Sequence, residues 1–176
     1  DINVIFYYAG HGVPNEKNNE AYLLPADATP SMLEACLPLS SLYSSIGSID
    51  AKQAIVFMDA CFSGSRRENG MIVSARGIAI KPKKDIVTGN VVVFSAADGS
   101  ETAYPYKEKG HGLFTYFLLK KLKESRGNVT LCDLADYIKT NVSQKSIVVN
   151  NKSQTPTISS SAQMQDVWRT MKLFRK

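Results

Sequence analysis

Two residues of the sequence could together form an activated nucleophile, and each follows an apolar run. Cys61 lies in 59-DACFSG-64, directly after the apolar run 54-AIVFM-58. His11 stands between two glycines, after the run 2-INVIFYYAG-10. A thiol with an ordinary pKa of about 8.5 is mostly protonated at neutral pH, and a neighbouring imidazole favours the thiolate and carries its proton. The sequence therefore suggests covalent chemistry by a cysteine and histidine pair.

The same two segments could also stabilise a negative charge that forms during acyl transfer. If the strands before His11 and Cys61 are neighbours, the two side chains would face each other across a cleft. The backbone N–H groups of Gly12 and Cys61 would then point at one spot, where they could hold the oxyanion of a tetrahedral intermediate. The other histidine, His111, precedes a predicted helix, and we expect it in a loop or at the start of that helix.

Apolar strands that alternate with amphipathic helices would position these residues. The pattern predicts strands over 2–10, 22–25, 54–58, 91–96 and about 155–159, and helices over 37–49, over 112–124 and from the N-cap Thr130 onward. Such alternation indicates a parallel sheet with helices on both faces. Functional residues of these sheets lie beyond the carboxyl ends of the strands. His11, Cys61 and the segment from Ser95 to Glu101 all fall at such ends.

Composition indicates one domain over residues 1–176 and argues against two classes of partner. The net charge is +5, but the basic residues lie in clusters without the interleaved aromatic side chains of a nucleic-acid platform. No apolar run approaches the roughly 18 residues that a membrane span needs. We therefore expect neither a nucleic-acid nor a membrane partner. The basic segment 65–90 is predicted to be a mobile loop, with an ordinary solvated surface as the alternative.

The cysteines do not form a paired framework. Cys36, Cys61 and Cys132 are three in number and show no C-x-x-C spacing. Unpaired thiols favour a reducing compartment such as the cytoplasm, although a signal peptide upstream of residue 1 stays open. We expect Cys36 in a short loop and Cys132 on an apolar helical face, both as small apolar residues.

The stretches 6-FYYAGHG-12 and 59-DACFSG-64 resemble the two signature motifs of the caspase-fold cysteine peptidases, and most of all their bacterial caspase-like and metacaspase branch. Similar segments of that family match 22-YLLPAD-27, 91-VVVFSAADGSETAY-104, 110-GHGLFTYFLL-119 and 153-SQTPTIS-159. The resemblance implies a three-layer α/β/α fold with a mostly parallel central sheet. It also implies peptide cleavage through a thioester, with His11 as general base and acid, Cys61 as nucleophile, and the amides of Gly12 and Cys61 as oxyanion hole.

Asp59 bears on which bond would be cut. The resemblance implies that an aspartate two positions before the nucleophile belongs to a pocket for Arg or Lys, since a carboxylate can bind a guanidinium in bidentate fashion. The alternative is that Asp59 only accepts hydrogen bonds from nearby backbone amides. Family members also bind substrate through the segment after the third strand, here Ser95, Ala96, Ala97 and Asp98. That segment carries no arginine that would select an acidic residue.

Two features of the resemblance concern partners and cofactors. Caspase-fold domains have two strands before the one that leads to the Gly-His-Gly motif, so an upstream fragment that completes the fold is an expected partner besides peptide substrates. Many metacaspases use calcium, but here only the scattered Asp27, Asp50 and Asp85 stand out. We expect no required cofactor, and calcium activation stays open.

Two other functions are compatible with the sequence. The first is a caspase-fold protein that binds or scaffolds without catalysis, although both His11 and Cys61 are present. The second is a peptidase with the same pair of residues that selects Asp or Asn. For a peptidase that selects Arg or Lys, the basic stretch from Arg66 to Lys84 is a candidate for self-cleavage.

Overall fold

The computed structural model describes residues 2–62, 83 and 85–174. A central sheet runs through it in the order β1-β5-β6-β9. Its strands are β1 (Asn3–Ala9), β5 (Gln53–Asp59), β6 (Val91–Ser95) and β9 (Thr157–Ser160). The first three are parallel and β9 is antiparallel to β6. The predicted mostly parallel sheet is confirmed. Most of the predicted loop 65–90 lies outside the described residues.

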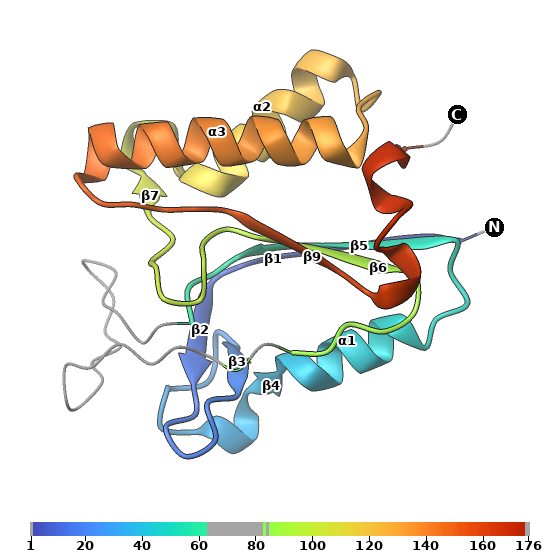
Figure 1. Ribbon diagram of the computed structural model, residues 1–176. Coiled ribbons are helices and arrows are strands. Elements are labelled where there is room, and N and C mark those ends of the chain that lie inside the picture. The colour runs from blue at the N-terminus through green and yellow to red at the C-terminus, as the bar shows by residue number, and fades with distance from the viewer. Residues whose placement is uncertain (1, 63–82, 84, 175–176) are drawn as a thin grey trace.

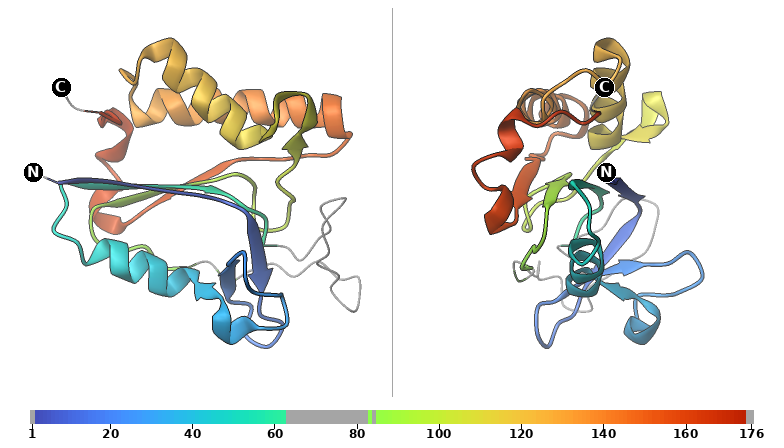
Figure 2. Two further views of the ribbon diagram at one scale, coloured as in Figure 1. Left: turned by 180° about the vertical axis from the view of Figure 1, so that it is seen from behind. Right: turned by 90° about the vertical axis from the view of Figure 1, so that its right-hand side faces the viewer.

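Helices cover both faces of this sheet and give the predicted three layers (Figure 1). The helix α1 (Leu39–Gly47) lies on one face. The helices α2 (Leu113–Ser125) and α3 (Leu131–Asn150) lie together on the other face (Figure 2). Thr130 is the N-cap of α3, as predicted, and its hydroxyl accepts a hydrogen bond from the Asp133 amide at 3.1 Å.

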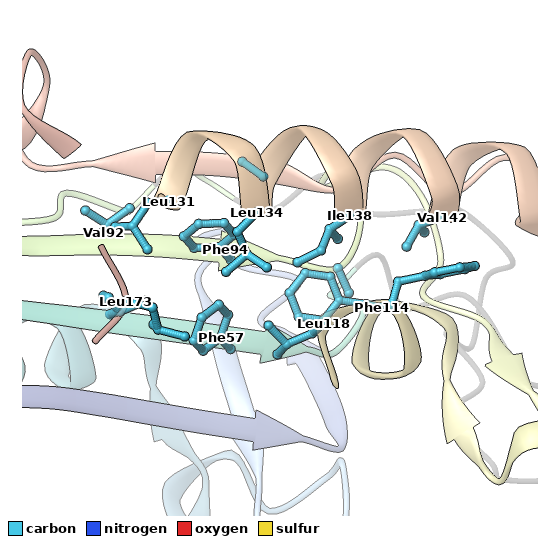
Figure 3. Packing of buried hydrophobic residues seen from close by; sticks show 14 of the residues in the cluster. Phe57, Val92, Phe94, Phe114, Leu118, Leu131, Leu134, Ile138, Val142 and Leu173 are labelled. Carbon is cyan, nitrogen blue, oxygen red and sulfur yellow. The ribbon is translucent and has the colours of Figure 1, made fainter. Parts of the chain in front are cut away.

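Each face of the sheet packs into its own hydrophobic core because alternate residues of a strand point to opposite faces. In β5, Ile55 and Phe57 face α2 and α3, whereas Val56 and Met58 face α1. Figure 3 shows Phe57 and Phe94 of neighbouring strands below Leu134 of α3, and the two rings lie 5.1 Å apart between centroids. All seven residues of β5 are buried, so the strand that leads to Cys61 is held from both sides.

The strand β1 lies at the edge of the sheet. It pairs with β5 on one side, and none of the described strands pairs with its other side. Its residues alternate between exposed and half-buried, and Ile5 and Tyr7 are 45% and 46% exposed. The edge is therefore apolar and open to solvent in this chain.

Two small sheets, which sequence patterns did not predict as such, lie beside the carboxyl ends of the central strands. One consists of β2 (His11–Pro14), β3 (Ala21–Leu24) and β4 (Leu37–Pro38), and the other of β7 (Pro105–Tyr106) and β8 (His111–Gly112). The described residues also form short 3-10 helices, namely η1 (Leu33–Ala35), η2 (Lys107–Lys109), η3 (Ala162–Met164) and η4 (Trp168–Thr170). His11 thus begins a strand of its own instead of merely following one.

Candidate active site

The strands that lead to His11 and Cys61 are direct neighbours, as expected. In the parallel pairing of β1 and β5, Ala9 lies opposite Asp59. The ladder continues past the strand ends, because the amide of Gly10 donates a hydrogen bond to the Asp59 carbonyl oxygen at 3.2 Å. The two conspicuous segments therefore leave the sheet at the same edge and side by side.

Gly12 brings these segments into contact. A Cβ atom at Gly12 would stand 2.7 Å from the carbonyl oxygen of Cys61 and would overlap the ring of Phe62. Real Cβ atoms essentially never approach other atoms so closely. The absence of a side chain at Gly12 is what lets the backbone after His11 lie against the backbone of Cys61.

Tyr8 holds the backbone of His11 in place. Its hydroxyl donates to the carbonyl oxygens of His11 at 2.8 Å and of Leu24 at 3.0 Å. His11 and Leu24 are also opposite each other in the pairing of β2 with β3. A tyrosine in an alternating strand gives no sign of such a role in the sequence, so Tyr8 was missed.

The three cysteines have different surroundings. Cys61 is 7% exposed and lies at the end of the core beneath α2 and α3. Cys36 is buried in a loop as expected, and its burial, together with the charge of Glu34, raises the pKa of its thiol. The expectation for Cys132 is wrong, because it is half-exposed beside the charged side chains of Asp136 and Arg169.

The carboxylate of Asp59 lies at the N-terminus of α2. Its Oδ2 accepts hydrogen bonds from the hydroxyl of Thr115 at 2.6 Å and from the amide of Thr115 at 3.2 Å. The backbone of Gly112 is packed against the same carboxylate, and Asp59 is only 2% exposed. A negative charge is favourable there because the free N–H groups and the dipole of the helix point toward it. Asp59 therefore accepts a hydrogen bond from a backbone amide, as its alternative role assumed. A role of Asp59 in specificity stays a prediction.

A cavity of about 370 Å³ opens next to this carboxylate. Tyr7, Gly112 and Thr115, which contact Asp59 or its hydrogen-bond partner, are among its walls, together with Ala9, Pro105, Tyr106, Lys107, Gly110 and His111. The hydroxyls of Tyr7 and Thr115 are 2.7 Å apart. Burial, and to a smaller extent the charge of Asp59, raises the pKa of Tyr7, while the bond to Thr115 lowers it.

The segment predicted to bind substrate follows β6, whose last residue is Ser95. The amide of Ala96 donates to the Met58 carbonyl oxygen at 2.9 Å, and the Ala96 carbonyl accepts from the Gln154 side chain at 2.9 Å. Ala96 thus has both backbone groups engaged within the protein. Ala97 is 9% exposed, and the Asp98 carboxylate accepts from the amide of Ser100 at 3.1 Å and closes a turn.

Further features of the described residues concern cofactors and membranes. In residues 2–62, 83 and 85–174, no three side chains of His, Cys, Asp or Glu gather where they could hold a metal ion. The described helices also include none with the length and apolar character needed to span a bilayer.

Comparisons with known proteins agree with this fold. The chain matches the family model described as caspase domain over residues 1–167. Its structure is similar to that of caspase-1 from Spodoptera frugiperda, with 15% identity, a TM-score of 0.60, and coverage of 90% of this chain and 59% of that one. The structure is also similar to that of a protein from Geobacter sulfurreducens, with 18% identity, a TM-score of 0.66, and coverage of 98% of this chain and 72% of that one.

The chain therefore spans little more than half of the first of these two structures. Among curated proteins, no significant match is found. At these identities the structural likeness shows the fold, and the family model, which covers nearly the whole chain, shows the family. The chain belongs to the caspase-domain family of cysteine peptidases.

Proposed function

We propose that this chain is a cysteine endopeptidase in which His11 activates Cys61 and which cleaves after Arg or Lys. The observation that carries the proposal is the contact that Gly12 makes with Cys61 and Phe62. Residues that are far apart in the sequence meet there, and the meeting point lies at the carboxyl edge of a parallel sheet, where such folds place their sites.

The proposed reaction needs only groups of these two segments and a water molecule. His11 accepts the proton of the Cys61 thiol, and the thiolate attacks the peptide carbonyl carbon. The backbone amides of Gly12 and Cys61 stabilise the oxyanion. The C–N bond then breaks, His11 gives its proton to the leaving amine, and a thioester remains on Cys61. Water, deprotonated by His11, attacks the thioester and releases the acid and the thiol.

The proposed specificity rests on Asp59 and the cavity beside it. A carboxylate with little exposure attracts a cation more strongly than it would in bulk water, because the surrounding protein screens the charge less. Three residues that line the 370 Å³ cavity connect it to this carboxylate. Thr115 donates a hydrogen bond to Asp59, Gly112 packs against it, and Tyr7 is bonded to Thr115. A guanidinium or ammonium group in the cavity would lie beside Gly112 and Thr115, which contact this carboxylate, and would be attracted by its charge.

One observation favours the second candidate specificity, for Asp or Asn. Lys107 and His111 also line the cavity, and His111 is exposed. A lysine at the rim attracts an acidic side chain and repels a basic one. The two specificities therefore differ in whether Asp59 or Lys107 dominates the potential of the cavity.

A peptide panel tests the proposed function. Fluorogenic peptides that differ only in a final Arg, Lys, Asp or Asn are incubated with wild type, His11→Ala and Cys61→Ala. Each assay is run with calcium and with a chelator. We expect turnover of the Arg and Lys peptides that both substitutions abolish. Turnover of the Asp or Asn peptide alone would support the second specificity. Turnover that survives in Cys61→Ala would refute the proposed nucleophile.

The open edge of β1 supports a proposed partner. Ile5 and Tyr7 are nearly half exposed on this strand, and Leu119 of α2 is 47% exposed. A strand from an upstream segment that pairs with β1 would cover the edge, and open apolar edges are otherwise prone to aggregation. We expect a longer chain that includes this segment to be more stable and more active. Equal melting temperatures of the two chains would contradict this.

Self-cleavage is a consequence of the proposed specificity combined with the basic residues of the sequence. The stretch from Arg66 to Lys84 holds several basic residues. We expect new chain ends after these residues when active protein is incubated, and none in Cys61→Ala. Mass spectrometry of the ends decides this. An intact stretch in protein that cleaves the Arg peptide would contradict it.

A further inference from the structure

Gln154 is a fully buried glutamine that bonds to both ends of a loop far from it in sequence. Its Nε2 donates to the carbonyl oxygen of Ala96 at 2.9 Å. Its Oε1 accepts from the amide of Tyr104 at 2.8 Å. The side chain is 0% exposed. One carboxamide therefore joins the first and the last residue of the loop 96–104, which directly follows the central strand β6.

The backbone of Gln154 is itself anchored to α3. Its amide donates to the Ser146 hydroxyl at 3.1 Å, and its carbonyl oxygen accepts from the Ser143 hydroxyl at 3.2 Å. Ser146 is 0% exposed. The position of the Gln154 side chain is thus fixed by the helix, so the loop that it holds is fixed to the same helix.

A second connection joins the same two segments. The carboxylate of Glu101, within the loop, accepts from the amide of Thr155 and from its hydroxyl at 3.1 Å. Residues 154 and 155 together contact the loop at its start, its middle and its end. The loop has its own turn at Asp98, its ends are bonded to Met58 and Leu113, and residues 154 and 155 bond to its start, middle and end.

The chain just after the loop and the chain just before Gln154 line a cavity of about 530 Å³. Tyr104 to Glu108 line one side, and Val148 to Lys152 line the other. Gln154 follows the second wall by two residues and bonds to the first residue of the opposite wall. The distance between the walls therefore depends on the bonds of Gln154.

We propose that Gln154 and its neighbour Thr155 are positioning residues that together set the shape of the loop 96–104 and thereby the affinity for peptide substrates. This rests on the proposed peptidase function and on the expectation, from the family resemblance, that the start of this loop, up to Asp98, binds substrate. The amide satisfies both partners at once, because its NH₂ donates to the carbonyl acceptor and its oxygen accepts from the N–H donor. A leucine offers neither group, and a carboxylate would place a second acceptor against the Ala96 carbonyl.

The test compares Gln154→Leu with a matched control, Gln53→Leu. Gln53 is also a buried glutamine, 1% exposed, and its Nε2 donates to the carbonyl oxygens of Lys172 at 3.1 Å and Leu173 at 3.2 Å. It lies at the opposite end of β5 from Asp59. Both substitutions remove buried hydrogen bonds, but only one acts on the loop 96–104.

Hydrogen exchange is the readout that does not depend on activity. We expect the amides of residues 97–104 to exchange about 10-fold faster in Gln154→Leu and at the wild-type rate in Gln53→Leu. With the Arg peptide, we expect KM to rise about 10-fold in Gln154→Leu while kcat changes little, as for lost uniform binding. Unchanged exchange in the loop, or equal changes in both variants, would overturn the proposal.

Thr155→Val covers the case in which Gln154→Leu does not fold. It removes only the hydroxyl that donates to Glu101. We expect a smaller increase, about 3-fold, in loop exchange and in KM. An unaltered loop in this variant would overturn the proposal as well. If wild type cleaves no peptide, the proposed function fails, whereas the exchange rates still decide whether residues 154 and 155 hold the loop.

Discussion

Substitution of Gly12 by alanine tests the contact on which the candidate site depends. The new methyl group would stand 2.7 Å from the Cys61 carbonyl oxygen and would overlap the Phe62 ring. The φ angle of Gly12 is not among the positive ones, so backbone strain adds nothing and the effect is steric. The methyl group needs about 3.4 Å or more for ordinary contact. The backbone of Gly12 and that of Cys61 must therefore separate by several tenths of an ångström.

The size of the effect follows from the two atoms that the methyl group meets. Overpacking of a close contact costs about 1–3 kcal/mol. The ring of Phe62 can rotate away, but the Cys61 carbonyl belongs to the backbone that carries the thiol. Displacements of the order of 1 Å within a catalytic group cost up to about 100-fold in rate. We expect Gly12→Ala to lower kcat/KM for the Arg peptide by about 10-fold to 100-fold.

The control is an equally crowded glycine elsewhere. A Cβ atom at Gly47, in α1, would stand 2.6 Å from the backbone oxygen of Thr88. We expect Gly47→Ala to lower the melting temperature as much as Gly12→Ala does while kcat/KM of the folded protein stays unchanged. In Gly12→Ala/Phe62→Ala, stability should recover more than activity, because the contact with Cys61 persists. Wild-type activity and stability of Gly12→Ala would refute the proposed closeness of the two segments.

Three further substitutions have defined outcomes. Asp59→Asn keeps an acceptor for Thr115 but removes the charge at the start of α2, so we expect a loss of about 1 kcal/mol in the free energy of unfolding. It should also lower Arg-peptide turnover at least about 10-fold, and unchanged turnover would speak against the specificity role. Thr130→Ala removes the N-cap bond to Asp133 and should cost about 1 kcal/mol, measured by urea unfolding; no loss would contradict the cap. Burial, and then the charge of Asp85, raises the pKa of Tyr43 in the folded protein. The unfolded protein therefore releases this proton first, and stability present below about pH 10 is lost as the pH rises further. Tyr43→Phe should reduce this loss, and an equal loss in both proteins would contradict it.

The sequence was sufficient for the strands of the central sheet because they are short apolar runs with clear ends. The run around Val56 is apolar at every position, which is typical of a strand buried on both faces, and β5 has this burial. The cap at Thr130 and the helix after it followed from side-chain type and spacing. The expectation that the strands before His11 and Cys61 are neighbours is confirmed by the pairing of β1 with β5.

Contacts over long sequence distances could not be predicted in the same way. The hydroxyl of Tyr8 and the amide of Gln154 act on backbone groups that local patterns do not specify. The short strands β7 and β8 have only two residues each, too few for any periodicity. Thr115 contacts Asp59 only because α2 begins directly over the end of β5. Such partners depend on tertiary packing, and a single sequence holds no local record of it.

Covalent labelling of Cys61 tests whether His11 activates this thiol. Peptidyl acyloxymethyl ketones with a final Arg or Asp are incubated with wild type and His11→Ala, and the modified cysteine is located by peptide mapping. Cys36 and Cys132 in the same chain serve as internal references. We expect one adduct, at Cys61 with the Arg reagent, and its loss in His11→Ala. Labelling of Cys132 in preference to Cys61, or equal labelling of Cys61 without His11, would contradict it.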